Sequence, residues 1–506
     1  MPQSFSQRTE EFRYRVGDVD VSSVTWRHPC GARGAPAEYD ALTYLRYHRH
    51  EGDSRPVTPD LVLSLQPGNT GGPSSFDPVA RNIVAALGHR GLRCEVWAMA
   101  RRSQRLADAT GMRAALARGD HRVAVDYYYR GRSLDGRTFP GWLPARRQGF
   151  LTRYGVEQAV SDWHFVHARE IPDPADRARR LFLGGHSLGG PLANLYCQWD
   201  FPTGPGYREV AGVIGLDGPI AVDPLDLAGH ARPAAEAARR VLPAAAAAMR
   251  TGLLPASNNW GALRLGDIAV LTGIAALAAR FEPEAESTLL PEVPRTLLVD
   301  GLFRLLYPRG GPRRWRLTNA ALFGTLFGRV AQATTLSNDM GGYTGPPRGK
   351  RAALTGLARI PLAGELFAAT LSERPLAMPA DPGVLTGWVD GGESISSFDD
   401  TVLAWGNGEF SYINGYESRL LPVEAVLGMF GALPAARHRE WMDSVPALTV
   451  ASGLWTPIRR RRGPRPQEIE APGYSHQDVL SARQPDVVVE SVADFLAAHL
   501  PARRTA

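Results

Sequence analysis

The chain has 506 residues, of which 44% are hydrophobic and 21% are charged, and it carries a formal net charge of +6. This composition is ordinary for a folded globular protein and argues against disorder, while the length favours a core domain with a large insertion, or two domains. The three cysteines are widely spaced, which favours free thiols over a disulfide framework. Arginine supplies almost all of the positive charge, because Lys350 is the only lysine.

The basic residues are densest at Arg459 to Arg462. No aromatic residues interleave with this run and no nucleic-acid-binding module accompanies it, so a solvated loop is favoured and no nucleic-acid partner is expected. Residues 1–11 lack the apolar segment of a signal peptide, and the longest apolar stretch, residues 268–279, is too short to cross a bilayer. We therefore expect a cytoplasmic protein without a transmembrane segment.

Strands and helices alternate over the first 218 residues. Residues 12–16 and 19–26 alternate in polarity around Gly17 and Asp18, which predicts an antiparallel hairpin, and residues 42–50 add a further strand. Apolar runs that predict parallel strands follow at 61–65, 92–100, 181–183 and 210–216, and helical spacing covers 76–87 and 155–170. This alternation favours an α/β fold with a mainly parallel sheet and helices on its faces.

The pattern changes after residue 218. Alanine-rich helical stretches are separated by proline and glycine breaks, and no alternation of strand and helix is visible. These helical stretches cover residues 234–249, 263–279 and 320–331. The strand pattern resumes at 445–451 and 467–471, and an amphipathic helix at 487–500 closes the chain. The sequence therefore predicts a core formed by residues 1–218 and 443–506, with a mostly helical insertion at 219–442.

A short glycine-rich stretch, Gly185-His186-Ser187-Leu188-Gly189, separates a predicted strand from a predicted helix. A strand that turns directly into a helix around G-x-S-x-G holds its serine on a strained backbone, with Oγ exposed and the helix N-terminus directed at it. With 53 glycines in the chain such a pentapeptide can arise by chance, but the strand and helix around it indicate a nucleophile. His186 leaves the turn in a different direction from Ser187, so we interpret it as a packing residue.

This stretch resembles the nucleophile elbow of the α/β-hydrolase superfamily, in its lipase-like G-H-S-L-G form. The resemblance implies an α/β-hydrolase sheet flanked by helices, with the insertion at 219–442 as an unusually large cap or lid. It also implies that the loop after strand 61–65 supplies one backbone N–H of an oxyanion hole. Asn69 is the donor we expect there, with Thr70 as the alternative, and Leu188 would supply the second N–H.

The same resemblance places the catalytic histidine in a loop between the last strand and the final helix. His476 stands in such a loop, at residues 472–478, and is the expected general base. The alternative is that His476 is an ordinary loop histidine. An acid must orient this base, and in the superfamily the acid lies between the serine and the histidine in the chain.

The acid departs from the common pattern. Most of the superfamily carries it in the loop that here spans residues 452–458, and this loop contains no carboxylate. Asp217 closes the strand at 210–216, much as the acid of pancreatic-type lipases follows their corresponding strand. The two strand ends are neighbours at the same rim of the sheet, so we predict Asp217 as the acid, with Asp390 and Glu470 as weaker substitutes. The structural alternative is that Asp217 caps the start of the insertion.

No cofactor or metal motif accompanies these residues. The glycine-rich loop at 68–72 lacks the lysine of a P-loop and the spacing of a dinucleotide-binding turn. His48 and His50 would share one face of a strand, but no cysteine or acidic ligand stands near them at metal-site spacing. We therefore expect no cofactor and no metal.

Together these residues predict a serine hydrolase that cleaves a carboxylic ester through an acyl-enzyme. A large apolar cap favours a small-molecule substrate that is lipophilic or bulky. Hydrolysis of an amide, lactone or thioester, or acyl transfer, would use the same residues. Because the acid is missing from its common position, a catalytically silent binding protein is the alternative, and the sequence leaves the oligomeric state open.

Overall fold

A nine-stranded sheet forms the centre of the computed structural model, which describes residues 7–30, 35–50, 52, 58–220, 228–261, 263–295, 300, 307–332, 336–344, 377–390, 392–407, 412–452 and 468–501. The strand order is β1-β2-β3-β5-β4-β6-β9-β14-β15. The strands are β1 (Arg8–Val16), β2 (Val19–Arg27), β3 (Ala41–Arg49), β4 (Leu61–Gln66), β5 (Cys94–Ala100), β6 (Leu181–His186), β9 (Gly212–Leu216), β14 (Ala447–Ala451) and β15 (Glu468–Glu470).

The sheet is antiparallel at one edge and parallel elsewhere. β1, β2 and β3 pair antiparallel in sequence, and β3 joins β5 antiparallel. From β5 through β4, β6, β9 and β14 to β15 all neighbours run parallel. Every residue of β4, β5 and β6 is buried, because helices cover both faces of the parallel part. This confirms the predicted α/β fold with a mainly parallel sheet.

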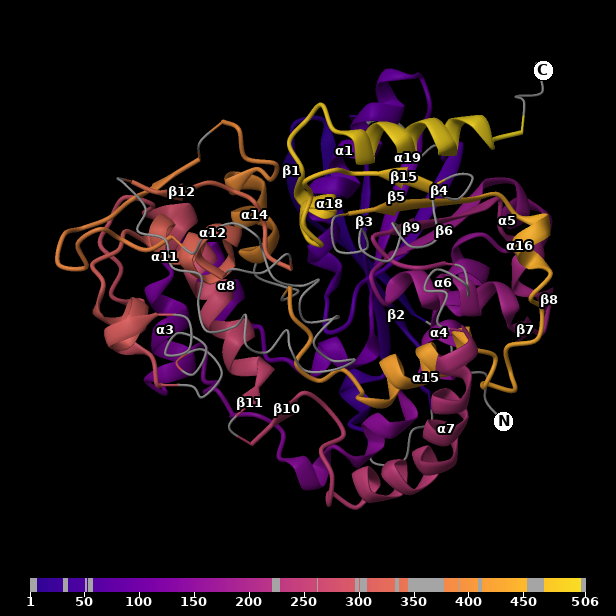
Figure 1. Cartoon of the computed structure of the whole chain (residues 1–506), viewed down its shortest axis with the longest axis horizontal. Coiled ribbons are helices and arrows are strands. Elements are labelled where there is room, and N and C mark those ends of the chain that lie inside the picture. Colours follow the sequence, from indigo (N-terminus) through magenta and orange to yellow (C-terminus); the bar gives the residue numbers. More distant parts are fainter. Residues whose placement is uncertain are drawn as a thin grey trace.

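Each face of the sheet has its own apolar layer. One layer joins the sheet to α1 (Asp77–His89), α18 (Asp478–Ser481) and α19 (Val487–Ala498). The opposite layer joins it to α4 (Val156–Glu170), α6 (Gly189–Gln198) and α15 (Leu420–Met429). Figure 1 shows α1 and α19 above the sheet and α4, α6 and α15 on its other side. α15 lies within residues 219–442 and yet packs on the core.

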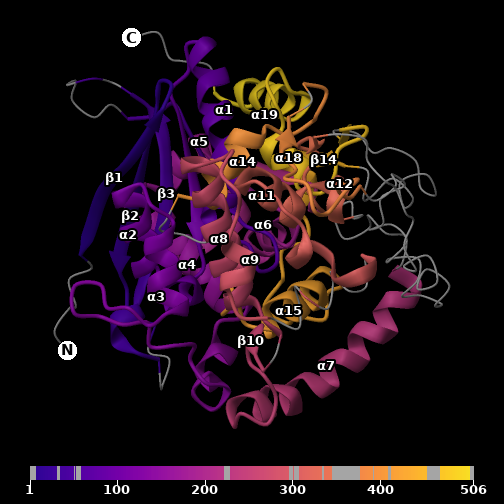
Figure 2. The same cartoon turned by 90° about the vertical axis from the view of Figure 1, so that its left-hand side faces the viewer.

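The described part of residues 219–442 is mostly helical, and its strands are two residues long. Its helices besides α15 are α7 (Ala228–Arg250), α8 (Leu265–Phe281), α9 (Leu289–Glu292), α11 (Asn319–Phe327), α12 (Arg329–Gln332), α14 (Phe398–Trp405) and α16 (Trp441–Ser444). Its strands pair as β10 (Asn259–Trp260) with β11 (Leu263–Arg264), and β12 (Gly342–Tyr343) with β13 (Trp388–Val389). Figure 2 shows α7 lying along the outer edge of the molecule.

A separate apolar cluster holds this helical part together around α8, whose side chains are nearly all buried from Val270 to Ala279. α11 and α14 pack against α8, and so do two helices that precede the elbow in the chain, α2 (Thr110–Arg118) and α3 (Arg122–Tyr129). The helical part therefore includes a segment that the sequence groups with the core. The boundaries at residues 219 and 442 stay a prediction.

The remaining short elements lie in the connections. α5 (Pro174–Arg180) leads into β6, and β7 (Asp200–Phe201) pairs with β8 (Gly204–Pro205). The 3₁₀ helices are Ala37–Tyr39, Pro73–Phe76, Arg102–Leu106, Ala145–Arg147, Gly149–Arg153, Gly206–Glu209 and Pro308–Arg314. Across the described ranges, no helix combines the length and apolar character that crossing a membrane requires. The arginine run at 459–462 lies outside the described residues.

Candidate active site

Ser187 lies in the turn between β6 and α6, with φ of +52°. Its N–H donates to the carbonyl of Leu216 at 3.2 Å, and its own carbonyl accepts from Gly190 at 3.1 Å. The flanking glycines are required by space, because a Cβ at Gly185 would lie 2.2 Å from the backbone of Gly189, and one at Gly189 would lie 2.0 Å from the carbonyl oxygen of Gln66. The strand, strained turn and helix have the geometry expected of a nucleophile elbow.

His476 and Asp217 lie in direct contact although 259 residues separate them. The distance from His476 Nδ1 to Asp217 Oδ2 is 2.5 Å. Asp217 directly follows β9, is fully buried, and donates its backbone N–H to the carbonyl of Val450 on the neighbouring β14 at 2.7 Å. A carboxylate on Nδ1 leaves Nε2 of the imidazole as the nitrogen that can serve a serine hydroxyl.

Ser452, the first residue after β14, holds the carboxylate of Asp217. Its N–H donates to Asp217 Oδ1 at 2.7 Å, and its Oγ donates to Oδ2 at 2.6 Å. Ser452 thus stands at the strand end where the superfamily commonly carries the acid, and it supplies hydrogen-bond donors in place of a carboxylate. The sequence interpretation missed this residue, although the absence of an acid from its loop pointed to the position.

The two weaker acid candidates lie elsewhere. Asp390 pairs with Arg483 and accepts the N–H of Phe398 at 3.4 Å. Glu470 is an exposed residue at the end of β15. Among the hydrogen bonds of the described residues, the carboxylate on the His476 ring is that of Asp217.

His186 contacts the backbone of the loop that carries His476. Its Nε2 lies 2.9 Å from the carbonyl oxygen of His476, and the two rings are 4.3 Å apart. Burial, together with the neighbouring His476, holds the pKa of His186 well below its usual range, so its ring is neutral and donates through Nε2. The structure thus places His186 as a packing and positioning residue of the elbow, as its backbone direction suggested.

The expected oxyanion loop lies directly against the elbow. A Cβ at Gly68 would lie 3.1 Å from Ser187 Cβ and 3.1 Å from His186 Nδ1, so a side chain here would crowd the serine turn. Within the described residues, the N–H groups of Asn69 and Leu188 donate to no protein acceptor. Asn69 is exposed at the loop tip, and Leu188 stands at the start of α6. Both groups are therefore open to a ligand.

Thr70, the alternative donor, is already engaged. Its backbone has φ of +57°, and its N–H donates to a carboxylate oxygen of Glu417, a residue of the helical insertion. The same carboxylate forms an ion pair with Arg101. This hydrogen bond engages the N–H of Thr70, so Asn69 is the stronger of the two candidate donors in this loop.

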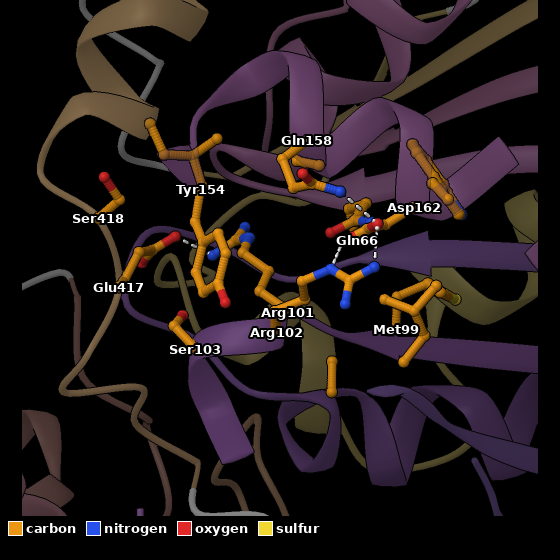
Figure 3. A pocket seen from close by; sticks show the side chains of 15 residues that line it. Gln66, Met99, Arg101, Arg102, Ser103, Tyr154, Gln158, Asp162, Glu417 and Ser418 are labelled. Carbon is orange, nitrogen blue, oxygen red and sulfur yellow. Dashed lines mark hydrogen bonds and ion pairs between the residues drawn. The ribbon is translucent and has the colours of Figure 1, made fainter. Parts of the chain in front are cut away.

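Arg101 and Glu417 form a buried brace behind this loop (Figure 3). Arg101 Nη1 donates to the carbonyl of Gly68 at 3.0 Å, and Nη2 donates to that of Pro67. Burial raises the pKa of Glu417 and lowers that of Arg101, because desolvation disfavours both charges. Removing either partner would therefore leave an uncompensated buried charge.

The segment 412–417 continues this contact along the oxyanion loop. The carbonyl of Tyr412 accepts from the N–H of Gly72 at 2.9 Å, and the N–H of Asn414 donates to the carbonyl of Thr70 at 2.6 Å. At its other side the Tyr412 hydroxyl donates to Gln477 Oε1 at 2.7 Å, next to His476. The segment therefore touches both loops of the site, and no motif in the sequence had singled it out.

Asp478 ties the histidine loop to the insertion a second time. Its carboxylate accepts from the N–H of Ser475 at 2.7 Å, from the N–H of Asp339 at 2.8 Å and from Ser396 Oγ at 2.6 Å. Burial raises the pKa of Asp478, although these hydrogen bonds act to lower it. Residues far apart in sequence thus converge on the loop that carries His476.

Among the described residues, no three metal-ligating side chains come together as a group, and His48 of β3 and His50, just after this strand, have other contacts. His50 Nδ1 lies 2.8 Å from Asp20 Oδ2, and His48 Nδ1 lies 3.0 Å from the carbonyl of Arg49. Both therefore act as partly exposed strand-end residues. The absence of a cofactor stays a prediction.

No protein-family model and no curated protein matches the sequence. Among solved structures, a protein from Sulfolobus solfataricus described as a candidate lipase has a TM-score of 0.42 and 13% identity, over 97% of this chain and 99% of that one. An esterase from Thermogutta terrifontis has a TM-score of 0.29 and 11% identity, over 91% and 96% of the chains. An epoxide hydrolase from Vigna radiata has a TM-score of 0.31 and 12% identity, over 91% and 94%.

These similarities are too distant to carry an argument about chemistry, and the fold is defined by the chain itself. Its mainly parallel sheet, the serine turn between β6 and α6, and the helices on both faces match the α/β-hydrolase fold.

Proposed function

We propose that this protein is a serine hydrolase that cleaves a carboxylic ester through an acyl-enzyme, with Ser187 as nucleophile, His476 as base and Asp217 as acid. The observation that carries the proposal is the 2.5 Å contact between His476 Nδ1 and Asp217 Oδ2 at the rim of the sheet where Ser187 stands on its strained turn. A buried carboxylate on a histidine beside an elbow serine is the arrangement that activates a serine hydroxyl.

In the proposed mechanism, His476 accepts the proton of Ser187 Oγ through Nε2 while Asp217 stabilises the imidazolium that forms. The serine oxygen attacks the ester carbonyl, and the N–H groups of Leu188 and Asn69 stabilise the negative charge on its oxygen. His476 then protonates the departing alcohol. Water attacks the acyl-enzyme in the second half, with His476 again as base, and releases the acid.

The substrate of the proposed enzyme is a small-molecule ester whose acid or alcohol part is lipophilic or bulky. The helical part of residues 219–442 supports this choice, because it packs around an extensive apolar cluster and contacts both loops beside Ser187. We propose that residues 219–442 act as a cap on a core of residues 1–218 and 443–506. Amide, lactone or thioester hydrolysis, and acyl transfer, would use the same three side chains.

Covalent labelling tests the proposal. A fluorophosphonate probe should label the wild-type protein at Ser187 and leave Ser187→Ala unlabelled. Turnover of nitrophenyl acetate by Ser187→Ala should fall roughly 10⁴-fold or more, because removing one member of such a triad removes the action of all three. If the folded wild type neither reacts with the probe nor turns over any ester, the alternative of a catalytically silent binding protein takes its place.

A further inference from the structure

The two helices α7 and α15 present apolar side chains to solvent. Along α7, Ala237, Val241 and Ala244 follow one another at helical spacing and are all exposed, Val241 to 63%. On α15, Val423 and Val426 are exposed to 38% and 50%. The shallow groove between the two helices is lined by apolar side chains alone, so α7 and α15 share one apolar surface.

This apolar surface extends past the end of α7 into the turn 251–254. Leu253 is 80% exposed and Leu254 is 43% exposed. Both donate their N–H groups to the carbonyl of Ala248, at 2.9 and 3.1 Å, which fixes the turn against the helix. α7 forms the outer edge of the molecule (Figure 2), so a flat partner can approach it along its length. Exposed apolar side chains gathered in this way mark an interaction surface.

Positive charge borders the apolar surface. The 3₁₀ helices at 145–147 and 149–153 pack against the end of α7, where a Cβ on Gly252 would lie 3.0 Å from Cα of Arg146. These segments and α7 carry six exposed arginines, namely Arg146, Arg147, Arg153, Arg239, Arg240 and Arg250. Within the described ranges, Arg239 is the one of the six that forms an ion pair, with Glu236 at 3.0 Å.

Few carboxylates offset this charge. Residues 145–153 and 235–254 hold the six arginines and one glutamate, a net charge of +5, whereas the whole chain carries +6. Glu424 of α15 accepts the N–H of Val156 at 2.8 Å, and burial raises its pKa. Glu157 of α4 lies near Glu424 and is exposed. The surface around α7 therefore remains strongly positive.

We propose that the surface formed by α7, α15 and the turn 251–254 docks onto a lipid membrane with anionic headgroups. Such a membrane offers phosphate groups to the arginines and an apolar layer to Val241 and Leu253 in the same place. A second copy related by a twofold axis would set arginines against arginines, and a nucleic acid would leave the apolar side chains in water. The proposal does not depend on the chemistry of Ser187.

Co-sedimentation of the full-length protein with vesicles tests this docking. The wild type should bind vesicles of phosphatidylcholine that contain about one third phosphatidylglycerol, and it should bind phosphatidylcholine alone at least about tenfold more weakly. Salt at about 0.5 M should weaken the binding to the anionic vesicles, because it screens the arginines. Absence of binding to the anionic vesicles at low salt would overturn the proposal.

Two double variants test the apolar and the basic groups separately. Leu253→Ser with Leu254→Ser should weaken binding to the anionic vesicles at least about tenfold, because these side chains no longer enter the apolar layer. Its matched control is Val384→Ser with Leu385→Ser, a neighbouring pair exposed to 58% and 40% ahead of β13, which should bind like the wild type.

Arg240→Ser with Arg250→Ser should also weaken binding at least about tenfold, because two cations at the membrane surface are lost. Arg118→Ser with Arg280→Ser removes the same charge from exposed positions on α2 and α8 and should stay within about threefold of the wild type. Equal losses in a test pair and its control, or full binding by the leucine variant, would overturn the assignment of this surface.

Sedimentation velocity addresses the alternative of a second copy. If the wild type is a dimer that Leu253→Ser with Leu254→Ser converts to a monomer, the surface joins two copies and the membrane proposal is overturned. Ser187→Ala should bind the anionic vesicles like the wild type, so failure of the proposed hydrolysis leaves the docking intact. The leucine and arginine variants should keep fluorophosphonate labelling, so failure of the docking leaves the hydrolysis intact.

Discussion

The two sides of Ser187 are built from different parts of the molecule. On one side, the strand ends of the sheet hold Asp217, which hydrogen-bonds Val450 through its backbone and Ser452 through its carboxylate. On the other side, the oxyanion loop depends on Arg101 and on Glu417 from the helical insertion. Asp217 is therefore fixed by contacts between neighbouring strand ends, whereas the loop is fixed by tertiary contacts with the insertion. In the proposed enzyme, changes in the insertion would thus alter the catalytic rate as well as the choice of substrate.

Of the variants that test this comparison, Asp217→Asn should lose the most activity. The amide cannot stabilise an imidazolium as a carboxylate does, so kcat for nitrophenyl acetate should fall roughly 10³- to 10⁴-fold with little change in KM. Asp390→Asn is the matched control, because it makes the same change at a carboxylate that pairs with Arg483 instead. Near wild-type activity in Asp217→Asn, or an equal loss in Asp390→Asn, would remove Asp217 from the proposed triad.

Glu417→Gln tests the proposed oxyanion loop, which is the side of Ser187 that depends on the insertion. Loss of the charge loosens the oxyanion loop, and kcat should fall about ten- to a hundredfold, less than the loss of an oxyanion donor itself. Glu424→Gln serves as control, since Glu424 is also a carboxylate of the insertion whose pKa is raised by burial, but it accepts the N–H of Val156 at 2.8 Å, away from the loop. Equal effects of the two variants would indicate a general loss of packing.

Titration of Glu417 in the Arg101–Glu417 pair should change stability and activity in opposite directions as pH changes. Burial raises the pKa of Glu417 above its ordinary value of 4.5, so the stability that this group contributes is fully present below that value and is lost as pH rises through the raised pKa. Activity changes in the opposite direction, because protonation breaks the ion pair as pH falls. As pH falls through the raised pKa of Glu417, the free energy of unfolding measured in urea should therefore rise while kcat falls in the wild type. Both changes should be smaller in Glu417→Gln.

Ser452→Ala should have the smallest effect. It removes the hydroxyl bond to Asp217 and keeps the backbone N–H bond, so kcat should fall about tenfold, as expected for one hydrogen bond to a charged group. Ser452→Thr retains a hydroxyl and should recover most of the activity. Equal activities of the alanine and threonine variants would show that the hydroxyl does not position the acid.

The sheet and the turn that carries Ser187 could be predicted because their signals are local. Alternating apolar runs and breaks indicate the strands, and the glycines around Ser187 indicate the elbow. Asp217 followed from topology, since adjacent parallel strands end at the same rim. The structure brings Asp217 and His476 together as that reasoning expected, while their catalytic roles stay proposals.

The braces of the oxyanion loop could not be predicted from these signals. Arg101 and Glu417 are 316 residues apart and carry no motif, and a pair of arginines after a strand normally indicates a solvated turn. Likewise, α2 and α3 precede the elbow in sequence and yet pack on α8. Such contacts depend on how the insertion folds back on the core, which periodicity along the chain does not encode.

The buried pair of Arg101 and Glu417 also limits how modular this molecule can be. Arg101 belongs to the sheet part and Glu417 to the insertion, so replacing Glu417 alone would leave a buried cation without its counter-charge, at a cost of about 3–5 kcal/mol. An insertion taken from another protein of this fold would have to carry an acidic residue to the same place. Core and insertion therefore have to be engineered as one unit.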